Sequence, residues 1–295
     1  MNHMMIRPSA RRWRPLLLRP ALLGAALLLF AVFLLPGAAH AAAPHASVPI
    51  TQDGADVLTG QAYLIDGVTY VPFRAFCELQ GCGQVRWDAR ARAAYATTPD
   101  GVTVCAFADG ALYLRYGERY FYTASPVRIV RDRLYIPIRP LAKCFGLTVA
   151  WNTASRSVAL TRAGAAPRAD VGVYDSDELY WLARIIQAEA GAEPLRGKLA
   201  VGNVILNRVR STAFPNTVYG VIFDRKHGVQ FTPTANGSIY REPSREAVVA
   251  ARLCLEGYTV SDEVLYFFNP AIAKSDWIAK NRAYAFRIGN HVFYR

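Results

Sequence analysis

Hydrophobic and polar positions change their spacing along the chain, and these changes divide it into three regions. Residues 21–35 form one uninterrupted apolar run. Between residues 50 and 163, short alternating stretches typical of strands are interrupted by turn residues and short helical patterns. From residue 174 to about residue 209, apolar positions recur every three to four residues, as in helices that bury one face. We therefore expect a targeting segment, then a domain of strands and short helices, then a mainly helical domain.

The first region has the three parts of a secretory signal. Residues 1–20 are basic, residues 21–35 are apolar, and Ala39-His40-Ala41 has the small-x-small pattern of a cleavage site. The alternative is an uncleaved anchor, but this apolar run is shorter than the roughly 20 residues that a spanning helix needs. We predict a signal peptide over residues 1–41 and a secreted product.

The second region contains two copies of one unit. Tyr70-Val71-Pro72-Phe73-Arg74 aligns with Tyr135-Ile136-Pro137-Ile138-Arg139, and Val85-Arg86-Trp87-Asp88 aligns with Val149-Ala150-Trp151-Asn152 after a slip of one residue. Each copy is predicted to run strand, short helix, strand. One unit alone would bury little apolar surface, so we expect the two copies to pack together.

Local signals support this reading of the first copy. Asp66-Gly67 between apolar stretches indicates a two-residue hairpin, and Val68 and Tyr70 have the period-two spacing of a strand. The following stretch is predicted to form a short helix that ends on Gly81.

The duplicated pattern resembles the copper amine oxidase N-terminal-like stalk domain found beside extracellular bacterial enzymes, over residues 50–163. The resemblance implies no metal, and this span contains no histidine that could supply a nitrogen ligand to copper. Trp87 and Trp151 could stack on sugars, but their equivalent positions favour a repeated core residue. Residues 164–173 are small and polar without periodicity, and we interpret them as a linker.

The cysteines fall into two groups. Four precede residue 150 and allow three pairings, among which the sequence does not choose. Cys254 lies on the apolar stripe of a helix that is expected to close at Gly257, so we predict a buried, inert thiol. The four early cysteines are Cys77, Cys82, Cys105 and Cys144.

The composition and charge of the chain exclude several classes of function. The chain has 295 residues, of which 53% are hydrophobic and 19% charged, so it is globular rather than disordered. Its net charge is +12, but five arginines lie in the first twenty residues and the remaining basic residues form no cluster, which argues against a nucleic-acid partner. No P-loop, Gly-x-Ser-x-Gly, His-Glu-x-x-His or Cys-x-x-Cys motif occurs, and the two histidines of the third region lack ligand spacing. We expect no cofactor and no metal.

In the third region, one carboxylate occupies a position that should be buried. A helix is predicted to open with a cap at Asp175, with Glu178 at capping-box spacing, and to run to about Ala190. Glu189 falls inside its apolar stripe and in its last turn, where burial and the helix dipole both raise a carboxyl pKa. A carboxylic acid that stays protonated near neutral pH can act as general acid in glycoside cleavage. The alternative is a core glutamate paired with an arginine.

The next helix is predicted from Pro194 to about Val209. Glu193 precedes it at the positive N-terminus, where a charged carboxylate is stabilised, so we expect a structural role near the site. Asn203 and Asn207 lie one turn apart and could face either the site or water.

Several segments together resemble the SleB-type cell-wall hydrolases. They cover nearly all of residues 178–294 in the family's order. The segments are Leu182 to Pro194, Gly197 to Val209, Phe214 to Val218, Gln230-Phe231, Leu265 to Pro270 and Gly289 to Phe293.

The resemblance implies a lysozyme-like domain that cleaves peptidoglycan, of the spore cortex-lytic kind. It assigns Glu189 as catalytic acid, as the first glutamate of the family's Ala-Glu-Ala-Arg-Gly-Glu-Pro motif. The sequence departs from that motif with Gly191-Ala192 in place of Arg-Gly. No second carboxylate is convincingly paired with Glu189, so both the residues and the resemblance favour lytic transglycosylation between N-acetylmuramic acid and N-acetylglucosamine.

Aromatic and polar residues in the same segments are suited to stacking on a glycan and hydrogen bonding with it. We expect a core role for Phe267 and Phe293. The candidate substrate-binding residues are Gln230, Phe231, Tyr266, Asn269, Trp277 and His291.

Taken together, these expectations describe an α+β chain. A duplicated α+β stalk domain at residues 50–163 precedes a lysozyme-like, mainly helical catalytic domain with a small β element at residues 174–295. The expected partner is the peptidoglycan glycan strand, in spore cortex or vegetative wall, with control by another wall protein left open. Two other functions also remain open: a peptidoglycan-binding protein with weak or lost activity, and an amidase of the stem peptide.

Overall fold

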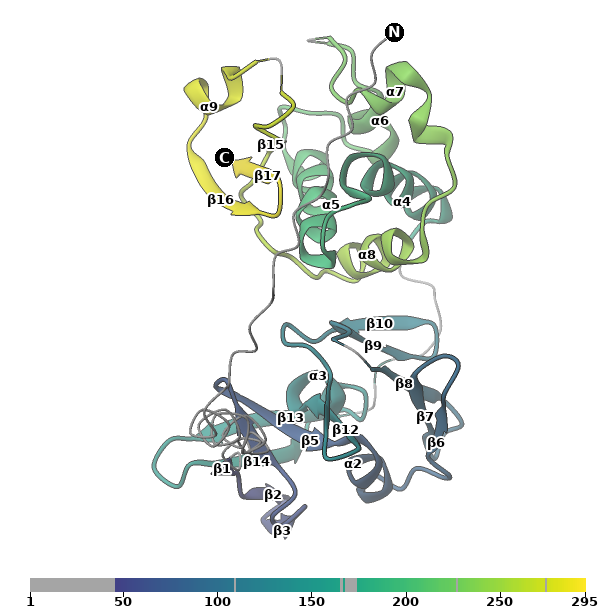
Figure 1. Cartoon of the computed structure of the whole chain (residues 1–295), viewed down its shortest axis with the longest axis vertical. Coiled ribbons are helices and arrows are strands. Elements are labelled where there is room, and N and C mark those ends of the chain that lie inside the picture. Colours follow the sequence, from purple (N-terminus) through teal and green to yellow (C-terminus); the bar gives the residue numbers. More distant parts are fainter. Residues whose placement is uncertain (1–45, 109, 165–166, 168–173, 227, 274) are drawn as a thin grey trace, which may run out of the picture. The chain divides into compact units, whose positions relative to one another are not determined.

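The computed structural model describes residues 46–108, 110–164, 167, 174–226, 228–273 and 275–295 (Figure 1). The signal peptide expected over residues 1–41 lies outside these ranges, as does most of the linker expected over residues 164–173. None of the helices in the described ranges is both long and apolar enough to cross a lipid bilayer.

The N-terminal half contains three β-sheets and two short helices. The sheet orders are β1-β4-β5-β12-β11, β10-β9-β8-β7-β6 and β13-β14-β2-β3. Neighbouring strands pair antiparallel except for the parallel pair β14–β2. The elements are β1 Ala46–Ser47, β2 Ile50–Gln52, β3 Ala55–Val57, β4 Tyr63–Ile65, β5 Val68–Pro72, α2 Phe73–Leu79, β6 Arg86–Asp88, β7 Ala93–Thr97, β8 Thr103–Phe107, β9 Tyr113–Tyr116, β10 Arg119–Tyr122, β11 Arg128–Val130, β12 Arg133–Pro137, α3 Ile138–Lys143, β13 Leu147–Asn152 and β14 Ser157–Arg162.

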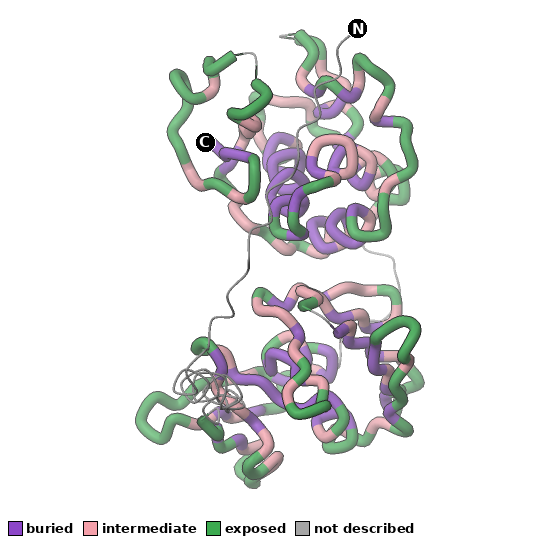
Figure 2. Tube along the Cα trace, in the orientation of Figure 1, coloured by how far each residue is buried: buried purple, intermediate pink, exposed green. Residues whose placement is uncertain are grey.

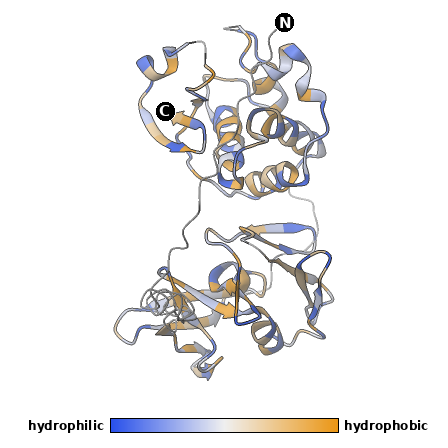
Figure 3. Cartoon of the chain, in the orientation of Figure 1, coloured by the Kyte–Doolittle hydropathy of each residue, from blue (hydrophilic) through white to orange (hydrophobic). Residues whose placement is uncertain are grey.

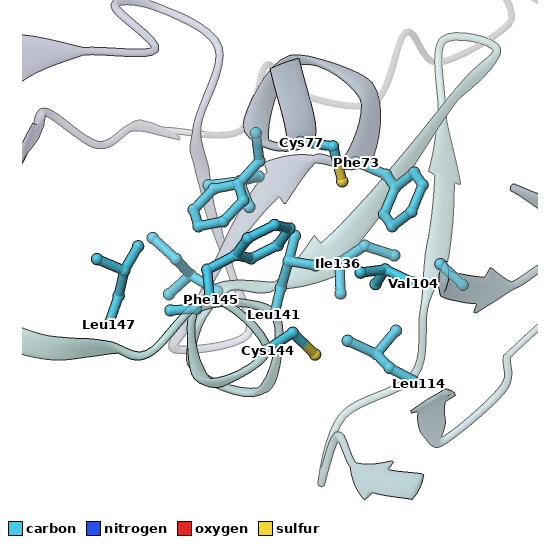
Figure 4. Packing of buried hydrophobic residues seen from close by; sticks show 14 of the residues in the cluster. Phe73, Cys77, Val104, Leu114, Ile136, Leu141, Cys144, Phe145 and Leu147 are labelled. Atoms are coloured by element: carbon cyan, nitrogen blue, oxygen red, sulfur yellow. The ribbon is translucent and has the colours of Figure 1, made fainter. Parts of the chain in front are cut away.

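The predicted repeat is present, and its two copies pack together. The first copy is β5-α2-β6 and the second is β12-α3-β13, and β5 pairs with β12 so that Val71 lies opposite Ile136. Phe76 of α2 meets Phe145, just after α3, with ring centroids 5.8 Å apart. Figure 4 shows the shared interior, into which Val104 of β8 also projects. The apolar positions of both copies therefore build one core.

The two-residue hairpin is also confirmed. Asp66 and Gly67 join β4 to β5, and Ile65 pairs with Val68 across the turn. Both turn residues have positive φ angles, 51° and 75°, as the tight turn between twisted strands requires.

The core role predicted for the two tryptophans is wrong. Trp87 is 46% exposed and Trp151 is 38% exposed. Both lie on edge strands, β6 and β13, where one side of the strand has no neighbour. Their matching positions reflect the duplicated topology, in which both copies end on an edge strand, rather than a shared interior.

The C-terminal half is mainly helical with one three-stranded antiparallel sheet, in the order β15-β17-β16. Figure 2 shows that α5 is buried along most of its length, and Figure 3 shows hydrophobic residues on α4, α5 and α8. This half is the largely helical part of an α+β chain, as predicted. Its elements are α4 Ser176–Ala190, α5 Leu195–Arg210, α6 Val218–Phe223, α7 Pro233–Asn236, the 3₁₀-helix η3 Ser238–Tyr240, α8 Arg245–Leu255, β15 Tyr266–Phe268, α9 Trp277–Asn281, β16 Tyr284–Ile288 and β17 His291–Tyr294.

The ends of α4 and α5 lie close to the predicted residues. Asp175 caps α4 by accepting a hydrogen bond from the Asp177 backbone N–H at 2.8 Å, and the helix ends at Ala190. Pro194 is the N-cap of α5 rather than its first helical residue, because its extended ψ of 159° leaves Leu195 to begin the helix. The short connection holds the end of α4 close to the start of α5.

The prediction for Cys254 is confirmed. Its thiol is buried in α8, and burial raises its pKa to about 12. All five cysteines carry free thiols, so the structure selects none of the three pairings that the sequence allows for the other four.

Candidate functional site

Glu189 is the residue before the end of α4, on the face that the apolar pattern predicted. Leu182, Ile185 and Ile186 on the same face are fully buried, while Glu189 itself is half-buried. Within the described ranges its carboxylate forms no hydrogen bond and no ion pair, so the alternative of a glutamate paired with an arginine does not apply there. Burial without a compensating partner raises the pKa of Glu189 from 4.5 to about 7.

This environment suits a carboxyl that both gives and takes a proton. With a pKa of about 7, protonated and ionised forms coexist near neutral pH. A general acid works best when its pKa lies close to the working pH, and the same group can then return to act as base.

Glu193, four residues further on, is buried and holds a different position. Its carboxylate accepts hydrogen bonds from the backbone N–H of Asn290 at 3.2 Å and from Asn290 Nδ2 at 3.0 Å. The Lys198 ammonium donates to its backbone carbonyl. At Gly289 a Cβ atom would lie 1.8 Å from Glu193 Oε2, so only glycine leaves room for this contact. The carboxylate therefore fastens the β16–β17 turn and does not cap α5, where no side-chain cap bond is present.

His291 is buried beside the Glu193 carboxylate and is not on the surface. It is 7% exposed, its Nδ1 is 3.9 Å from Glu193 Oε1, and its ring packs edge-on against Phe267. Burial lowers the pKa of the imidazole, and the Glu193 carboxylate opposes that shift. The neutral ring is thus part of the support for the turn, and a direct role in substrate binding would require it to become accessible.

Asn203 and Asn207 face neither the site nor water. Both are buried, Asn203 donating to the Tyr258 carbonyl at 3.1 Å and accepting from the Val260 N–H at 2.7 Å. Asn207 donates to the Ser261 and Val264 carbonyls, each at 3.0 Å. The two amides hold the main chain that leads into β15.

Arg208 was not among the candidates from the sequence, but it contacts three of them. Its Nη1 donates to Gln230 Oε1 at 3.5 Å, and its guanidinium lies 5.3 Å from the Phe231 ring centroid and 5.5 Å from that of Tyr266. Phe231 is 4% exposed, while Gln230 and Tyr266 are half-buried. Its sequence position could have indicated its burial, because Arg208 follows Val204 by four residues and so lies on the apolar stripe of α5.

The remaining candidates differ in accessibility. Trp277 is 51% exposed at the start of α9, and the Arg282 guanidinium lies 5.1 Å from its ring centroid and 4.5 Å from that of Tyr266. Asn269 accepts a hydrogen bond from the Ala271 N–H, so its side chain shapes a turn. Phe267 is half-buried and Phe293 fully buried, in line with their expected core roles. Within the described ranges, Glu189 makes no polar contact with any of these groups.

Comparisons with known proteins relate each half of the chain to a family. Residues 192–294 match the family described as Cell Wall Hydrolase, and residues 51–160 match the Copper amine oxidase N-terminal domain. Despite that name, the second match contains no histidine, and no group of three metal-ligating side chains occurs in the described ranges. The donor set therefore does not fit copper.

The relatives share the C-terminal half. The spore cortex-lytic enzyme of Bacillus subtilis (strain 168) is 41% identical over 122 residues, which are 41% of this chain and 39% of that enzyme. The spore cortex-lytic enzyme of Oceanobacillus iheyensis is 40% identical over 120 residues, 41% of this chain and 42% of that enzyme. The chain thus spans less than half the length of these relatives.

A solved structure is also similar, that of the catalytic domain of the germination-specific lytic transglycosylase SleB from Bacillus anthracis. It is 38% identical, with a TM-score of 0.39, and the match covers 43% of this chain and all of that domain. The family matches and the identities to the spore cortex-lytic enzymes lead to one conclusion: the chain carries a cell wall hydrolase domain of the SleB-like family, preceded by a copper amine oxidase N-terminal domain.

Proposed function

We propose that the chain cleaves the glycan strands of peptidoglycan as a lytic transglycosylase, acting between N-acetylmuramic acid and N-acetylglucosamine in cell wall or spore cortex. The proposal depends on one observation above all, the half-buried Glu189 carboxyl, which lacks a cation partner in the described ranges and has a pKa of about 7. The names of the relatives, spore cortex-lytic enzymes and a lytic transglycosylase, support the same substrate and reaction.

In the proposed mechanism Glu189 serves first as acid and then as base. The protonated carboxyl gives its proton to the glycosidic oxygen that leaves C1 of N-acetylmuramic acid, and an oxocarbenium-like centre develops at C1. The carboxylate that remains takes the proton from the C6 hydroxyl of the same sugar as that oxygen bonds to C1. The product is a 1,6-anhydro ring, and no water is consumed.

The surroundings of Glu189 favour attack by the sugar's own hydroxyl over attack by water. A hydrolase needs a second carboxylate roughly 5 to 10 Å from the acid. Glu193 is the nearest in sequence, but its carboxylate is bound to Asn290 and the β16–β17 turn. Asp276 forms an ion pair with Lys280 at 2.8 Å. The Glu193 carboxylate is therefore committed to a structural contact, which supports chemistry with a single carboxylate.

Digestion of purified peptidoglycan tests bond and product together. The wild-type chain should release muropeptides with 1,6-anhydro ends, which mass spectrometry detects. Digestion in H₂¹⁸O should leave those ends unlabelled. Glu189→Gln should lower the rate by about 10² to 10⁴ or more, because an amide cannot donate the proton. Glu178→Gln, the same change at the other end of α4, is the matched control and should cleave normally.

Two results would contradict the proposal. Label at the new muramic C1 would show hydrolysis with water. Activity of Glu189→Gln within a few-fold of wild type would show that the acid is another group. Running the digest on both spore cortex and vegetative sacculi compares the two sources of substrate.

A further inference from the structure

Arg208 is a buried cation without an acidic partner. It is 6% exposed, and within the described ranges no carboxylate lies within 4.0 Å of it. Its Nε donates to the Leu265 carbonyl at 2.8 Å and its Nη1 to Gln230 at 3.5 Å, while the Phe214 ring centroid is 4.8 Å away. Burial lowers the pKa of this guanidinium to about 10, so it remains charged at neutral pH. A buried charge of this kind is costly unless it is paired.

Arg282 is a second guanidinium near Tyr266 and, unlike Arg208, it is exposed. It lies over the Tyr266 and Trp277 rings, and its Nη1 donates a hydrogen bond to the neighbouring Asn281 carbonyl at 3.4 Å. The Tyr266 ring centroid is thus 5.5 Å from the Arg208 guanidinium and 4.5 Å from that of Arg282. Two guanidinium groups, one buried and one exposed, therefore lie near one half-buried aromatic ring.

Asp224 and Asp276 form no ion pair with Arg208 or Arg282 within the described ranges. Asp224 raises the pKa of Arg208 through space, but its Oδ1 accepts a hydrogen bond from the Lys226 N–H at 2.9 Å. Asp276, the residue before α9, is paired with Lys280. Elsewhere in this half, buried cations do have acidic partners: Arg184 pairs with Glu242 at 2.9 Å and Lys198 with Glu246 at 2.7 Å. Arg208 differs from these two buried cations, because no carboxylate forms an ion pair with it in the described ranges.

We propose that the exposed Arg282, beside Tyr266 and with the buried charge of Arg208 near the same ring, binds a carboxylate carried by the muramic acid residues of the glycan strand. This assignment rests on the function proposed above. A guanidinium presents a planar fork of N–H donors that matches a carboxylate, and an aromatic ring beside it can stack on a sugar. N-acetylglucosamine has no carboxylate, so the site would distinguish the two alternating sugars and set the register of the strand.

The carboxylate has two sources on the strand, the stem peptide and the lactyl group that is freed when the peptide is removed. We would measure the dissociation constant of the full-length Glu189→Gln chain for solubilised glycan strands, so that no cleavage intervenes. Three substrates are compared: strands with stem peptides, strands stripped by an amidase, and strands of either kind with their carboxylates converted to methylamides.

Neutralising the carboxylates should weaken binding about 10-fold, the usual value of one charge-assisted hydrogen bond. Adding Arg282→Gln should weaken binding to the unmodified strands by a similar factor and leave binding to the methylamides unchanged. Arg208→Lys, which keeps the charge but loses the fork, should give a smaller loss. If conversion to methylamides also weakens the binding of stripped strands, the bound group is the lactyl carboxylate. If it weakens only the binding of strands with stem peptides, the bound carboxylate belongs to the stem peptide.

The control is Arg196→Gln, which removes the same charge at the exposed start of α5. Equal binding of native and neutralised strands would overturn the proposal, as would equal losses from Arg282→Gln and Arg196→Gln. Thermal melts show whether each variant is folded, and Arg282 is exposed enough to be replaced safely. If wild-type chain cleaved no peptidoglycan at all, the proposed function would fail, while the binding data would still report on the carboxylate site.

Discussion

Replacing Glu189 with glutamine should make the folded chain more stable at neutral and alkaline pH. The same substitution should abolish the proposed catalysis. Glutamine has the size of the protonated glutamate and never ionises. In the wild-type chain the carboxyl has a pKa of about 7 when folded and an ordinary value near 4.5 when exposed. Ionising this group in the folded chain costs free energy, because burial removes water and the described residues supply no cation in exchange.

The sign and size follow from these two pKa values. Between pH 4.5 and 7 the folded chain holds a proton that the unfolded chain has lost, so the free energy of unfolding falls as pH rises through this range. At 1.36 kcal/mol for each pKa unit, the loss between pH 5 and pH 8 is about 2 to 3 kcal/mol. The variant lacks this term, so its stability relative to wild type should rise by that amount over the same interval.

Urea denaturation of both chains at pH 5, 6, 7 and 8 measures the difference directly, and the contributions of all other ionisable groups cancel between them. Glu178→Gln on the first turn of the same helix is the control and should give a difference that barely changes with pH. A Glu189→Gln difference that is flat from pH 5 to pH 8 would refute the reasoning, because it would mean that the carboxyl titrates alike in both states.

Three further outcomes are expected. Residues 170–295 should fold alone by circular dichroism and cleave peptidoglycan, because the fully buried residues of the two halves form separate clusters and only partly buried side chains such as Tyr120 and Tyr122 pack against the C-terminal one; an insoluble or unfolded fragment would contradict this. Gly289→Ala should lower the free energy of unfolding, measured in urea, by about 2 to 4 kcal/mol, because the positive φ of 55° strains an alanine and its Cβ would displace Glu193. The control Gly257→Ala has open space around it and should show only the smaller cost of the backbone strain. Iodoacetamide should label Cys82 first under native conditions by mass spectrometry, because it alone among the cysteines is half-buried and interaction with the Cys77 thiol lowers its pKa; equal labelling of all five would argue against this packing.

Features set by neighbours along the chain could be predicted from the sequence. The cap at Asp175, the turn at Asp66-Gly67 and the limits of α4 depend on residues a few positions apart, so local chemistry determines them. The burial of Glu189 followed in the same way, because the helical period assigns each residue to a face. Pairing of the two repeats was predictable because one copy alone cannot cover its apolar surface.

Features set by distant segments could not be predicted. Asn203 and Asn207 read as a polar stripe, and only the folded chain brings the carbonyls of residues 258–264 to them. Burial of Arg208 depends on rings from three separate segments, and exposure of Trp87 depends on which strand ends the sheet. In each case the deciding partner lies far away in sequence, where a spacing rule gives no information.

The inward-facing donors of α5 have a consequence for how this protein can vary. Asn203, Asn207 and Arg208 hold the path of residues 258–265 entirely through its main-chain atoms. Main-chain groups are the same whatever side chains the segment carries, apart from the N–H that proline lacks. The exposed side chains of this segment, Thr259, Asp262 and Glu263, can therefore be exchanged while its course into β15 stays constant. Val264 must stay apolar because it is fully buried, but the exposed positions suit library design that alters the surface without moving Tyr266.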